Sequence, residues 1–253
     1  MRVTFIGCGT AIPRPGLRPT SLWIDIRPDV QLRIDCGPGA VHSTPQHGLD
    51  WQSQTHQLVT HFHIDHVGDV PTLLFAFRYG RKPVPRGPLE LIGPAGFRKL
   101  LTDLDAIVSP SILKQEFELR IREVAPDATH ELAPGVTLRT AATKHTPESL
   151  AYRIDAGGKS IGFTGDATPA ADLAPLFEGV DLLISECSSI EPQAEPVHLA
   201  VNDVATLAAA SSAGHLVATH CYYDPVGEKL ADRLAALFDG RVTVAYDGLQ
   251  IEL

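Results

Sequence analysis

The sequence has few of the features that mark membrane-spanning, disulfide-bonded or cysteine–metal proteins. No apolar run reaches the roughly 18 residues that a membrane-spanning helix needs. The four cysteines are widely spaced and form no CxxC pair, which argues against a disulfide framework and against a cysteine-type zinc site. We therefore expect buried, reduced thiols at these positions, which are Cys8, Cys36, Cys187 and Cys221.

Positive charge is also scarce. The chain has 21 Lys and Arg residues against 30 Asp and Glu residues, a net charge of −9, which argues against broad binding to a nucleic-acid backbone through charge alone. This balance does not exclude a small phosphate-bearing substrate. The one local basic stretch, formed by Arg78, Arg81, Lys82 and Arg86, is expected to be a solvated loop.

The chain shows no sign of division or of export. Its opening residues, MRVTFIGCGTA, read as a strand before a Gly-rich turn and not as a signal peptide, so we expect a cytoplasmic location. No internal repeat, low-complexity tract or linker interrupts the 253 residues, and 44% of them are hydrophobic. The sequence therefore predicts a single domain over residues 1–253 with a large core.

Strands are predicted where short apolar runs end at Gly, Pro or Asp turn signals. They cover residues 2–7, 20–26, 30–35, 57–60, 89–93, 136–143, 151–156, 159–166, 181–187, 215–220 and 242–253. Helices are predicted over residues 70–80, 94–107, 201–213 and 228–240, with Asn202 as a candidate N-cap. This pattern predicts an α/β fold of two packed sheets with helices outside, although alternation alone also allows one doubly wound sheet.

A dense group of potential metal ligands follows the strand predicted at residues 57–60. His61, His63, Asp65 and His66 lie within six residues. In an extended segment residues two apart point the same way, so the first three can face one cavity while His66 diverges toward a second ion. Imidazole nitrogen and carboxylate oxygen suit zinc, and also manganese or iron. Such a run typically indicates a metal site and not a His-rich surface loop.

Three further ligands are predicted at later strand ends. His145, Asp166 and His220 each follow an apolar run directly. Each is weak evidence alone, because a single polar residue at a strand end is often only a turn residue. Together with the first cluster they supply enough ligands for two ions, which need at least one bridging group.

The pattern HxHxDH, with a distant His, an Asp in FTGD and a His in ATH, resembles the metallo-β-lactamase superfamily. The resemblance covers nearly the whole chain and implies a four-layer αβ/βα sandwich of two mixed β-sheets flanked by helices, with two divalent metal ions at one edge. It assigns the ligands as follows: His61, His63 and His145 to one ion; Asp65, His66 and His220 to the other; and Asp166 to both. Asp35, in IDCGPGA, matches an Asp that braces the site. A hydroxide between the metals would be the nucleophile.

Several segments resemble the ribonuclease Z-type branch of that superfamily. HTPESLAYRI, over residues 145–154, resembles its H-x-x-x-S-x-x-Y-R-I segment, so Ser149 and Arg153 are candidates to hold phosphate oxygens. PVHL resembles the segment that supplies a proton donor, here His198, and Glu186 in DLLISEC would orient it. Asp65 is counted as catalytic as well as a ligand. The resemblance thus implies a phosphodiesterase, which we expect to contain zinc, and it also suggests a homodimer.

One departure affects the expected substrate. Ribonuclease Z-type enzymes usually carry a long arm between the third His and the bridging Asp, and the short gap from His145 to Asp166 leaves no room for one. A small cyclic phosphodiester is therefore as reasonable an expectation as an RNA 3′ end. A lactone or thioester hydrolase on the same fold is an alternative, although those enzymes lack the S-x-x-Y-R-I segment. A non-catalytic protein that binds RNA or a nucleotide is the other, and the full ligand set argues against it.

Overall fold

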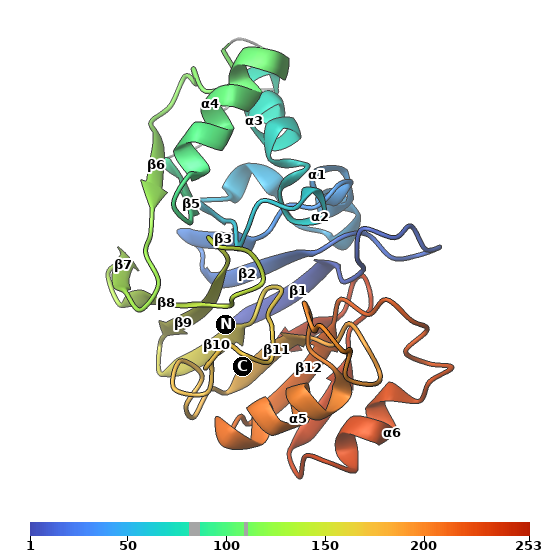
Figure 1. Ribbon diagram of the computed structural model, residues 1–253. Coiled ribbons are helices and arrows are strands. Elements are labelled where there is room, and N and C mark those ends of the chain that lie inside the picture. The colour runs from blue at the N-terminus through green and yellow to red at the C-terminus, as the bar shows by residue number, and fades with distance from the viewer. Residues whose placement is uncertain (81–86, 109–110) are drawn as a thin grey trace.

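The protein is a sandwich of two seven-stranded sheets with helices on both outer faces, as the computed structural model shows (Figure 1). The structure describes residues 1–80, 87–108 and 111–253. The helices near the top of Figure 1 cover the first sheet, and those at the bottom cover the second. The predicted four-layer α/β architecture is confirmed, and the doubly wound alternative is wrong.

The first sheet comes mostly from the first half of the chain and has the order β14-β1-β2-β3-β4-β5-β6. Its neighbours β3 to β6 run parallel, whereas β14, β1, β2 and β3 pair antiparallel. The strands are β1 (Arg2–Gly7), β2 (Ser21–Arg27), β3 (Val30–Ile34), β4 (His56–Leu58), β5 (Leu89–Gly93), β6 (Leu119–Glu123) and β14 (Gln250–Glu252). The helices of this half are α1 (Ala40–Ser43), α2 (Ile64–Val67), α3 (Val70–Tyr79) and α4 (Phe97–Val108), with 3₁₀ turns η1 (Thr44–His47) and η2 (Trp51–Ser53).

The second sheet has the order β13-β12-β11-β10-β9-β8-β7. Strands β10 to β13 run parallel, and β7 to β10 pair antiparallel. The strands are β7 (Thr129–Ala133), β8 (Val136–Ala142), β9 (Leu150–Ala156), β10 (Lys159–Phe163), β11 (Leu182–Glu186), β12 (His215–Thr219) and β13 (Arg241–Val244). Helices α5 (Val201–Ala210) and α6 (Leu230–Ala235) cover its outer face.

Buried side chains fill all three interfaces between the four layers. In β2, Leu22 and Ile24 belong to the core between the sheets, while Trp23 belongs to the core under the helices of the first half. Alternate strand residues point to opposite faces, so a strand that is apolar at every position is buried on both sides. This explains why most strands of the sequence read as continuous apolar runs.

Two predictions about individual elements were wrong, and two strands were missed. The strand expected over residues 242–253 is two strands, β13 and β14, which belong to different sheets. The chain crosses between them through a turn in which Gly248 has a φ of 93°, a value that favours glycine. The N-cap of α5 is Ala200 and not Asn202. Strands β6 and β7 were not predicted, because their residues alternate between exposed and half-buried and carry several charges.

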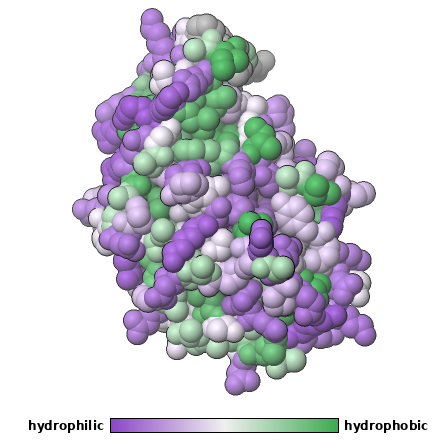
Figure 2. All heavy atoms as spheres, in the orientation of Figure 1, coloured by the Kyte–Doolittle hydropathy of each residue, from purple (hydrophilic) through white to green (hydrophobic). Residues whose placement is uncertain are grey.

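Among the residues that the structure describes, no helix is long and apolar enough to cross a membrane. In Figure 2 apolar and polar side chains are mixed on this face, with apolar atoms visible over the α3 and α4 region. Phe75, Tyr79 and Ile107 are exposed there. Most of the basic stretch expected to form a loop, Arg81, Lys82 and Arg86, lies outside the described residues.

Candidate metal centre

Most of the predicted ligands meet at one edge of the sandwich because they follow the carboxyl ends of parallel strands, whereas His145 follows the antiparallel strand β8. In the first half the run from His61 to His66 follows β4 and enters α2. In the second half Asp166 follows β10 and His220 follows β12. Strand β11, whose last residue is Glu186, lies between those two strands in the sheet. Ligands in open α/β sheets bind outside the carboxyl ends of strands for the same reason.

The structure brings all seven predicted ligands into adjoining groups. One group is His61, His63, His145 and Asp166, and a second is Asp65, His66 and His220. The potential ligand atoms of each group lie within 4.8 Å of one another. Both groups combine residues from the two halves of the chain, so each would be assembled only when the two sheets pack.

Asp166 lies between the two groups and presents one carboxylate oxygen to each. Its Oδ2 is 3.7 Å from Nε2 of His61 and 3.6 Å from Nε2 of His145. Its Oδ1 is 3.3 Å from Nε2 of His66 and 3.6 Å from Nδ1 of His220. On the other side of the second group, Oδ2 of Asp65 is 3.3 Å from Nε2 of His220. This arrangement fits a carboxylate that bridges two cations.

Asp35 fixes the orientation of two of these histidines. It is fully buried and accepts a hydrogen bond of 2.7 Å from Nδ1 of His66. It also accepts bonds from the backbone N–H and the hydroxyl of Thr60, at 2.8 and 2.9 Å. Because the Thr60 hydroxyl donates to Asp35, it can accept from Nδ1 of His61, which lies 3.0 Å away. These bonds engage Nδ1 of both rings and leave Nε2 as the atom that can bind a metal.

Two further histidines are held in the same way through Nδ1. His145 donates from Nδ1 to the backbone oxygen of Val197, at 2.7 Å. Nδ1 of His220 is 3.1 Å from the hydroxyl of Ser188, whose own proton goes to Glu186. The exposed His63 is different, because its Nδ1 faces Nε2 of His145 at 3.2 Å. Four of the five predicted histidine ligands therefore have Nδ1 within hydrogen-bond distance of a neighbouring group and Nε2 turned toward the cluster.

The polar atoms of the centre fit divalent cations. Nε2 of His61, Nε2 of His66 and Oδ1 of Asp166 are buried without a hydrogen-bond partner among the described residues. Four carboxylates are buried together here, Asp35, Asp65, Asp166 and Glu186. The ion pairs of these carboxylates are all to histidines in the described part of the chain. Buried carboxylates are costly unless positive charge is close, and a cation held by this oxygen and nitrogen set supplies it.

Electrostatic effects in the cluster shift the pKa values of His61 and His66 in opposite directions. Burial and the charge of His66 hold the pKa of His61 far below its usual range, so this ring is neutral and able to bind a metal. Burial alone would lower the pKa of His66, but the carboxylates of Asp166 and Asp35 raise it well above its usual value. Burial likewise disfavours the charged form of Asp166, yet the charges of His220 and His66 hold its pKa well below the ordinary range. Asp166 is thus a carboxylate able to bridge.

His198 and Glu186 form a pair beside this cluster. Nδ1 of His198 lies 3.1 and 3.0 Å from the two oxygens of Glu186 and 3.9 Å from Oδ2 of Asp166. Burial would lower the pKa of His198, but the hydrogen bond and charge of Glu186 outweigh it and raise the pKa. Because Nδ1 is bonded to the carboxylate, Nε2 is left to face a substrate. His198 also falls in a third candidate metal group with Asp166 and His220, so its geometry allows a ligand role as well.

The structure gives Ser149 and Arg153 partners other than the predicted phosphate. The Ser149 hydroxyl is buried, accepts from the Thr146 backbone N–H and donates to the Thr146 backbone oxygen, at 3.0 and 2.9 Å. Arg153 donates to the backbone oxygens of Leu176 and Glu178 and pairs with Asp155. Ser149 therefore shapes the turn that carries His145, and Arg153 ties β9 to the 176–178 segment. Both side chains thus have partners within the fold, and the expected phosphate contact stays a prediction.

The sequence prediction missed three groups that link or orient residues of the centre through hydrogen bonds. The Ser188 hydroxyl links Glu186 to His220, Thr60 links Asp35 to His61, and the Val197 carbonyl orients His145. Each residue is next to, or two positions from, a predicted site residue, but Ser, Thr and backbone groups are too common to be recognised from spacing alone. The left-handed φ values of Asp35 (56°) and His220 (54°) were not readable from the sequence either.

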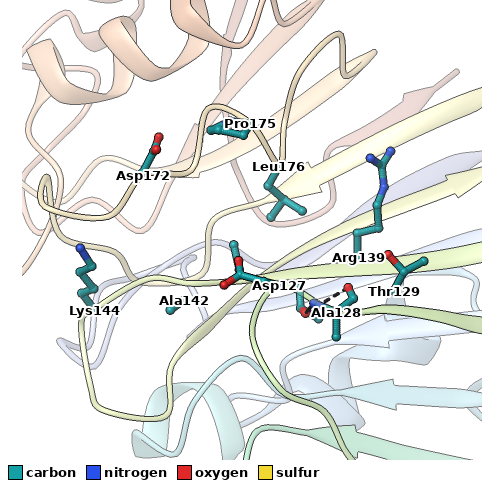
Figure 3. Close-up of a pocket in the computed structure, with 11 residues that line it drawn as sticks. Asp127, Ala128, Thr129, Arg139, Ala142, Lys144, Asp172, Pro175 and Leu176 are labelled. Atoms are coloured by element: carbon teal, nitrogen blue, oxygen red, sulfur yellow. Dashed lines mark hydrogen bonds between the residues drawn. The ribbon is translucent and has the colours of Figure 1, made fainter.

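A separate surface pocket of about 490 Å³ opens beside the turn that carries His145. Lys144 and Arg139 line it together with Asp127 and Asp172, and Arg139 also pairs with Asp155 at 2.9 Å. In the view of Figure 3 Lys144 and Arg139 lie toward opposite ends, with Asp127 between them. The basic side chains of this pocket are thus balanced by acidic ones.

The family of the chain follows from a comparison with known protein families. The model for the "Beta-lactamase superfamily domain" matches residues 31–221, which contain every predicted ligand and both members of the His198–Glu186 pair. The chain belongs to this superfamily. Within the match lie both candidate metal groups and the strands whose ends carry them.

Individual relatives agree with this membership. The chain is 26% identical to "Ribonuclease Z" of Mycobacterium bovis BCG in an alignment that covers 100% of this chain and 98% of the relative. Among solved structures, it is similar to the metallo-β-lactamase fold protein YhfI of Bacillus subtilis, with a TM-score of 0.84, 24% identity and 99% coverage of both chains. It is also similar to the short form of human tRNase Z, with a TM-score of 0.81, 22% identity and coverage of 100% and 99%.

Proposed function

We propose that this protein is a metal-dependent phosphodiesterase. The single observation that carries the proposal is the His198–Glu186 pair, which lies against Asp166 beside two groups of metal-ligating side chains. A phosphodiesterase needs both parts, because the phosphorus must be attacked while the leaving oxygen is protonated. Its ribonuclease Z relatives are named for a reaction of this class, which supports the assignment.

The residues of the chain divide this work. His61, His63 and His145 would hold one ion, Asp65, His66 and His220 would hold the other, and Asp166 would touch both. When bound, the two cations would activate water and offset the negative charge that develops on the phosphodiester. Asp35 keeps Nε2 of His66 directed at the centre.

His198 is placed to protonate the leaving oxygen. Its raised pKa keeps the ring protonated to higher pH than an ordinary histidine, so that a proton is available at Nε2. Glu186 accepts from Nδ1, fixes the ring plane and stabilises the protonated form. The same carboxylate also accepts a hydrogen bond of 2.6 Å from the backbone N–H of Ala167, the residue after Asp166. Glu186 thereby bonds both the proposed proton donor, His198, and the backbone next to the proposed bridging carboxylate, Asp166.

A short phosphodiester is the substrate that the described surface favours. The segment between His145 and Asp166 consists of the turn at Ser149, strands β9 and β10, and the Gly157–Gly158 turn that joins them. It forms no protruding arm. The adjacent pocket offers balanced charge and not the basic surface that follows a long polyanion. We therefore propose a small cyclic phosphodiester or the 3′ end of an RNA as the substrate, in preference to an extended RNA.

The metals, the domain, the location and the oligomeric state are part of the same proposal. The donor set of imidazoles and carboxylates suits two zinc ions, with manganese or iron as alternatives. The core between the sheets draws on both halves of the chain, which supports one domain over residues 1–253. Four unpaired cysteines suit a reducing, cytoplasmic compartment. The homodimer stays a prediction from family resemblance.

Hydrolysis of bis-p-nitrophenyl phosphate by protein supplied with zinc tests the proposal directly. We expect turnover that a chelator abolishes, with much lower rates on p-nitrophenyl acetate, a thioester and an acyl-homoserine lactone. Faster turnover of the thioester or lactone would assign the protein to another branch of the superfamily. Binding of nucleotides without any turnover, by protein that has its full metal complement, would assign it as a non-catalytic binding protein. A panel of 2′,3′- and 3′,5′-cyclic nucleotides and precursor transfer RNA then selects the substrate.

A further inference from the structure

Three exposed apolar residues lie within two positions of a predicted site residue in the chain. Ile64, between His63 and Asp65, is 67% exposed. Val197 precedes His198 and is 51% exposed, and Tyr222 follows His220 by two positions and is 38% exposed. These three residues are called the apolar rim below. Isolated exposed apolar residues are ordinary, but three of them so close in the chain to predicted site residues point to a binding role.

Tyr222 is the aromatic member of the rim. Its ring centroid lies 5.6 Å from that of His198, at an interplanar angle of 48°, and 5.4 Å from that of His220, at 81°. The ring is therefore beside both the proposed proton donor and a metal ligand. Its hydroxyl makes no hydrogen bond among the described residues. By contrast, the hydroxyl of Tyr152 donates to the Val59 backbone oxygen, and that of Tyr223 lies 3.4 Å from Sγ of Cys187.

The backbone beneath Tyr222 is braced from another part of the chain. Nη2 of Arg14 donates to the backbone oxygen of Tyr222, and Nη1 donates to that of Tyr223. Arg14 belongs to the loop between β1 and β2. A ring on a braced backbone loses little further freedom when a ligand stacks on it, so it is suited to binding.

We propose that Tyr222 determines specificity by stacking on a nucleobase that the scissile phosphodiester carries. This inference rests on the proposed function and adds the substrate class, a nucleoside phosphodiester. A flat aromatic face binds a flat base through stacking, and it does so with little dependence on base identity. Ile64 and Val197 supply the apolar contact for the sugar and the base edge. An aliphatic phosphodiester would use the same metal centre without using the ring.

Two diesters with the same leaving group separate stacking from chemistry. Thymidine 5′-(p-nitrophenyl phosphate) carries a base, methyl p-nitrophenyl phosphate carries none, and both release p-nitrophenolate. We expect the wild type to prefer the thymidine diester. In Tyr222→Leu the ratio of kcat/KM between the two diesters should fall about tenfold, which corresponds to about 1.4 kcal/mol. Tyr222→Phe keeps the aromatic face and should keep the ratio.

Tyr79→Leu is the matched control, since Tyr79 is an exposed tyrosine, 60% exposed, that contacts Phe75 on α3. Its ratio should equal that of the wild type. An unchanged ratio in Tyr222→Leu, or an equal loss on both diesters, overturns the proposal. If the wild type hydrolyses neither diester, the proposed function fails while the rim is still testable by calorimetry. Thymidine 5′-monophosphate should then bind the metal-loaded wild type about tenfold more tightly than Tyr222→Leu, and equal affinities overturn the role of Tyr222.

Discussion

The carboxylate of Glu186 accepts from Nδ1 of His198 at 3.0 Å while its other bonds reach the chain beside Asp166 and the hydroxyl of Ser188. One buried side chain therefore connects the proposed proton donor, the backbone beside the proposed bridging carboxylate and, through Ser188, the proposed ligand His220. Burial raises the pKa of Glu186, and the hydrogen bond and charge of His198 oppose that rise. The pair is best understood as one unit that holds one proton at His198.

Replacement of His198 by Ala should slow turnover by about 10²- to 10⁴-fold, the usual contribution of a positioned general acid. The loss should be large for a diester with an alkoxide leaving group and small for one that releases p-nitrophenolate, because a weakly basic leaving group needs little protonation. Metal content, measured by elemental analysis, should stay at the wild-type level. Loss of metal in His198→Ala would instead make His198 a ligand, as its place beside Asp166 and His220 also allows.

The metal complement should be two ions per chain. Elemental analysis of protein purified without added metal should find about two equivalents, which we expect to be zinc. Asp166→Ala should reduce the content and abolish turnover, since Asp166 contacts both groups. Asp172→Ala, which alters an acid of the neighbouring pocket, is the control and should change neither. Folded wild-type protein that reproducibly contains no metal would refute the two-ion proposal.

Asp35→Asn should weaken metal binding by about 10- to 100-fold without removing a ligand, as is typical when the hydrogen-bond partner of a metal-bound histidine is changed. Asn tolerates the left-handed conformation of this position, where φ is 56°, so the backbone can be kept. Competition with a chromogenic chelator measures the affinity. Asp29→Asn, at an exposed acid paired with Arg27, is the control. An unchanged affinity in Asp35→Asn would show that the bond to His66 does not support the metal.

His215 should make stability depend on pH between about 4 and 6.5. Burial, helped by the charge of Arg241, lowers the pKa of His215 to about 4, below its ordinary value of about 6.5. The unfolded chain therefore binds a proton in this range that the folded chain does not. The stability that neutral His215 contributes above pH 6.5 is therefore lost as the pH falls toward 4. The Tm of His215→Gln should fall less than that of the wild type between pH 7 and pH 4.5.

His215 also lies 2.9 Å from the Thr243 hydroxyl, so the variant loses stability at pH 7 and only the change with pH is informative. His42→Gln, at an exposed position, is the control and should follow the wild type. The prediction would be contradicted if the Tm values of the wild type and of His215→Gln fell in parallel as the pH is lowered.

The four thiols should be unreactive in the folded protein. Cys8, Cys36, Cys187 and Cys221 are all buried and unpaired. Burial raises the pKa of Cys36 to about 11 and that of Cys187 to about 12, so little thiolate is present at neutral pH. Ellman's reagent should titrate about four thiols in denaturant and react slowly without it. Rapid modification of the folded, metal-loaded protein would show that the structure opens near one of them.

The features that could best be predicted from the sequence were the cluster of potential metal ligands and the strands that are buried on both faces. His61, His63, Asp65 and His66 could be singled out because four potential ligands in one short run rarely arise for another reason, and the structure places them in two candidate metal groups. Most buried strands were found because both faces are apolar. Strands β6 and β7 escaped because their mixed polarity matches no simple period, and the division of residues 242–253 between two sheets depends on long-range pairing.

The partners of Arg153 could not be predicted for a related reason. Its motif made this charged residue of a buried strand a candidate for a substrate contact, and the structure gives it hydrogen bonds to the backbone oxygens of residues 176 and 178. Such partners come from a turn that the strand pattern does not specify. The clustering of the candidate ligands could be predicted because they share one chemistry, whereas the groups that orient them, such as Ser188 and the Val197 carbonyl, could not be predicted.

The mixed origin of both ligand groups has a thermodynamic consequence. Because each group takes side chains from both sheets, neither sheet alone retains a complete set. Ions that bind only the packed sandwich stabilise it by linkage, and the free energy they contribute depends on their concentration. Metal loading should therefore make the two halves unfold as one cooperative unit, and chelation should let them melt more independently.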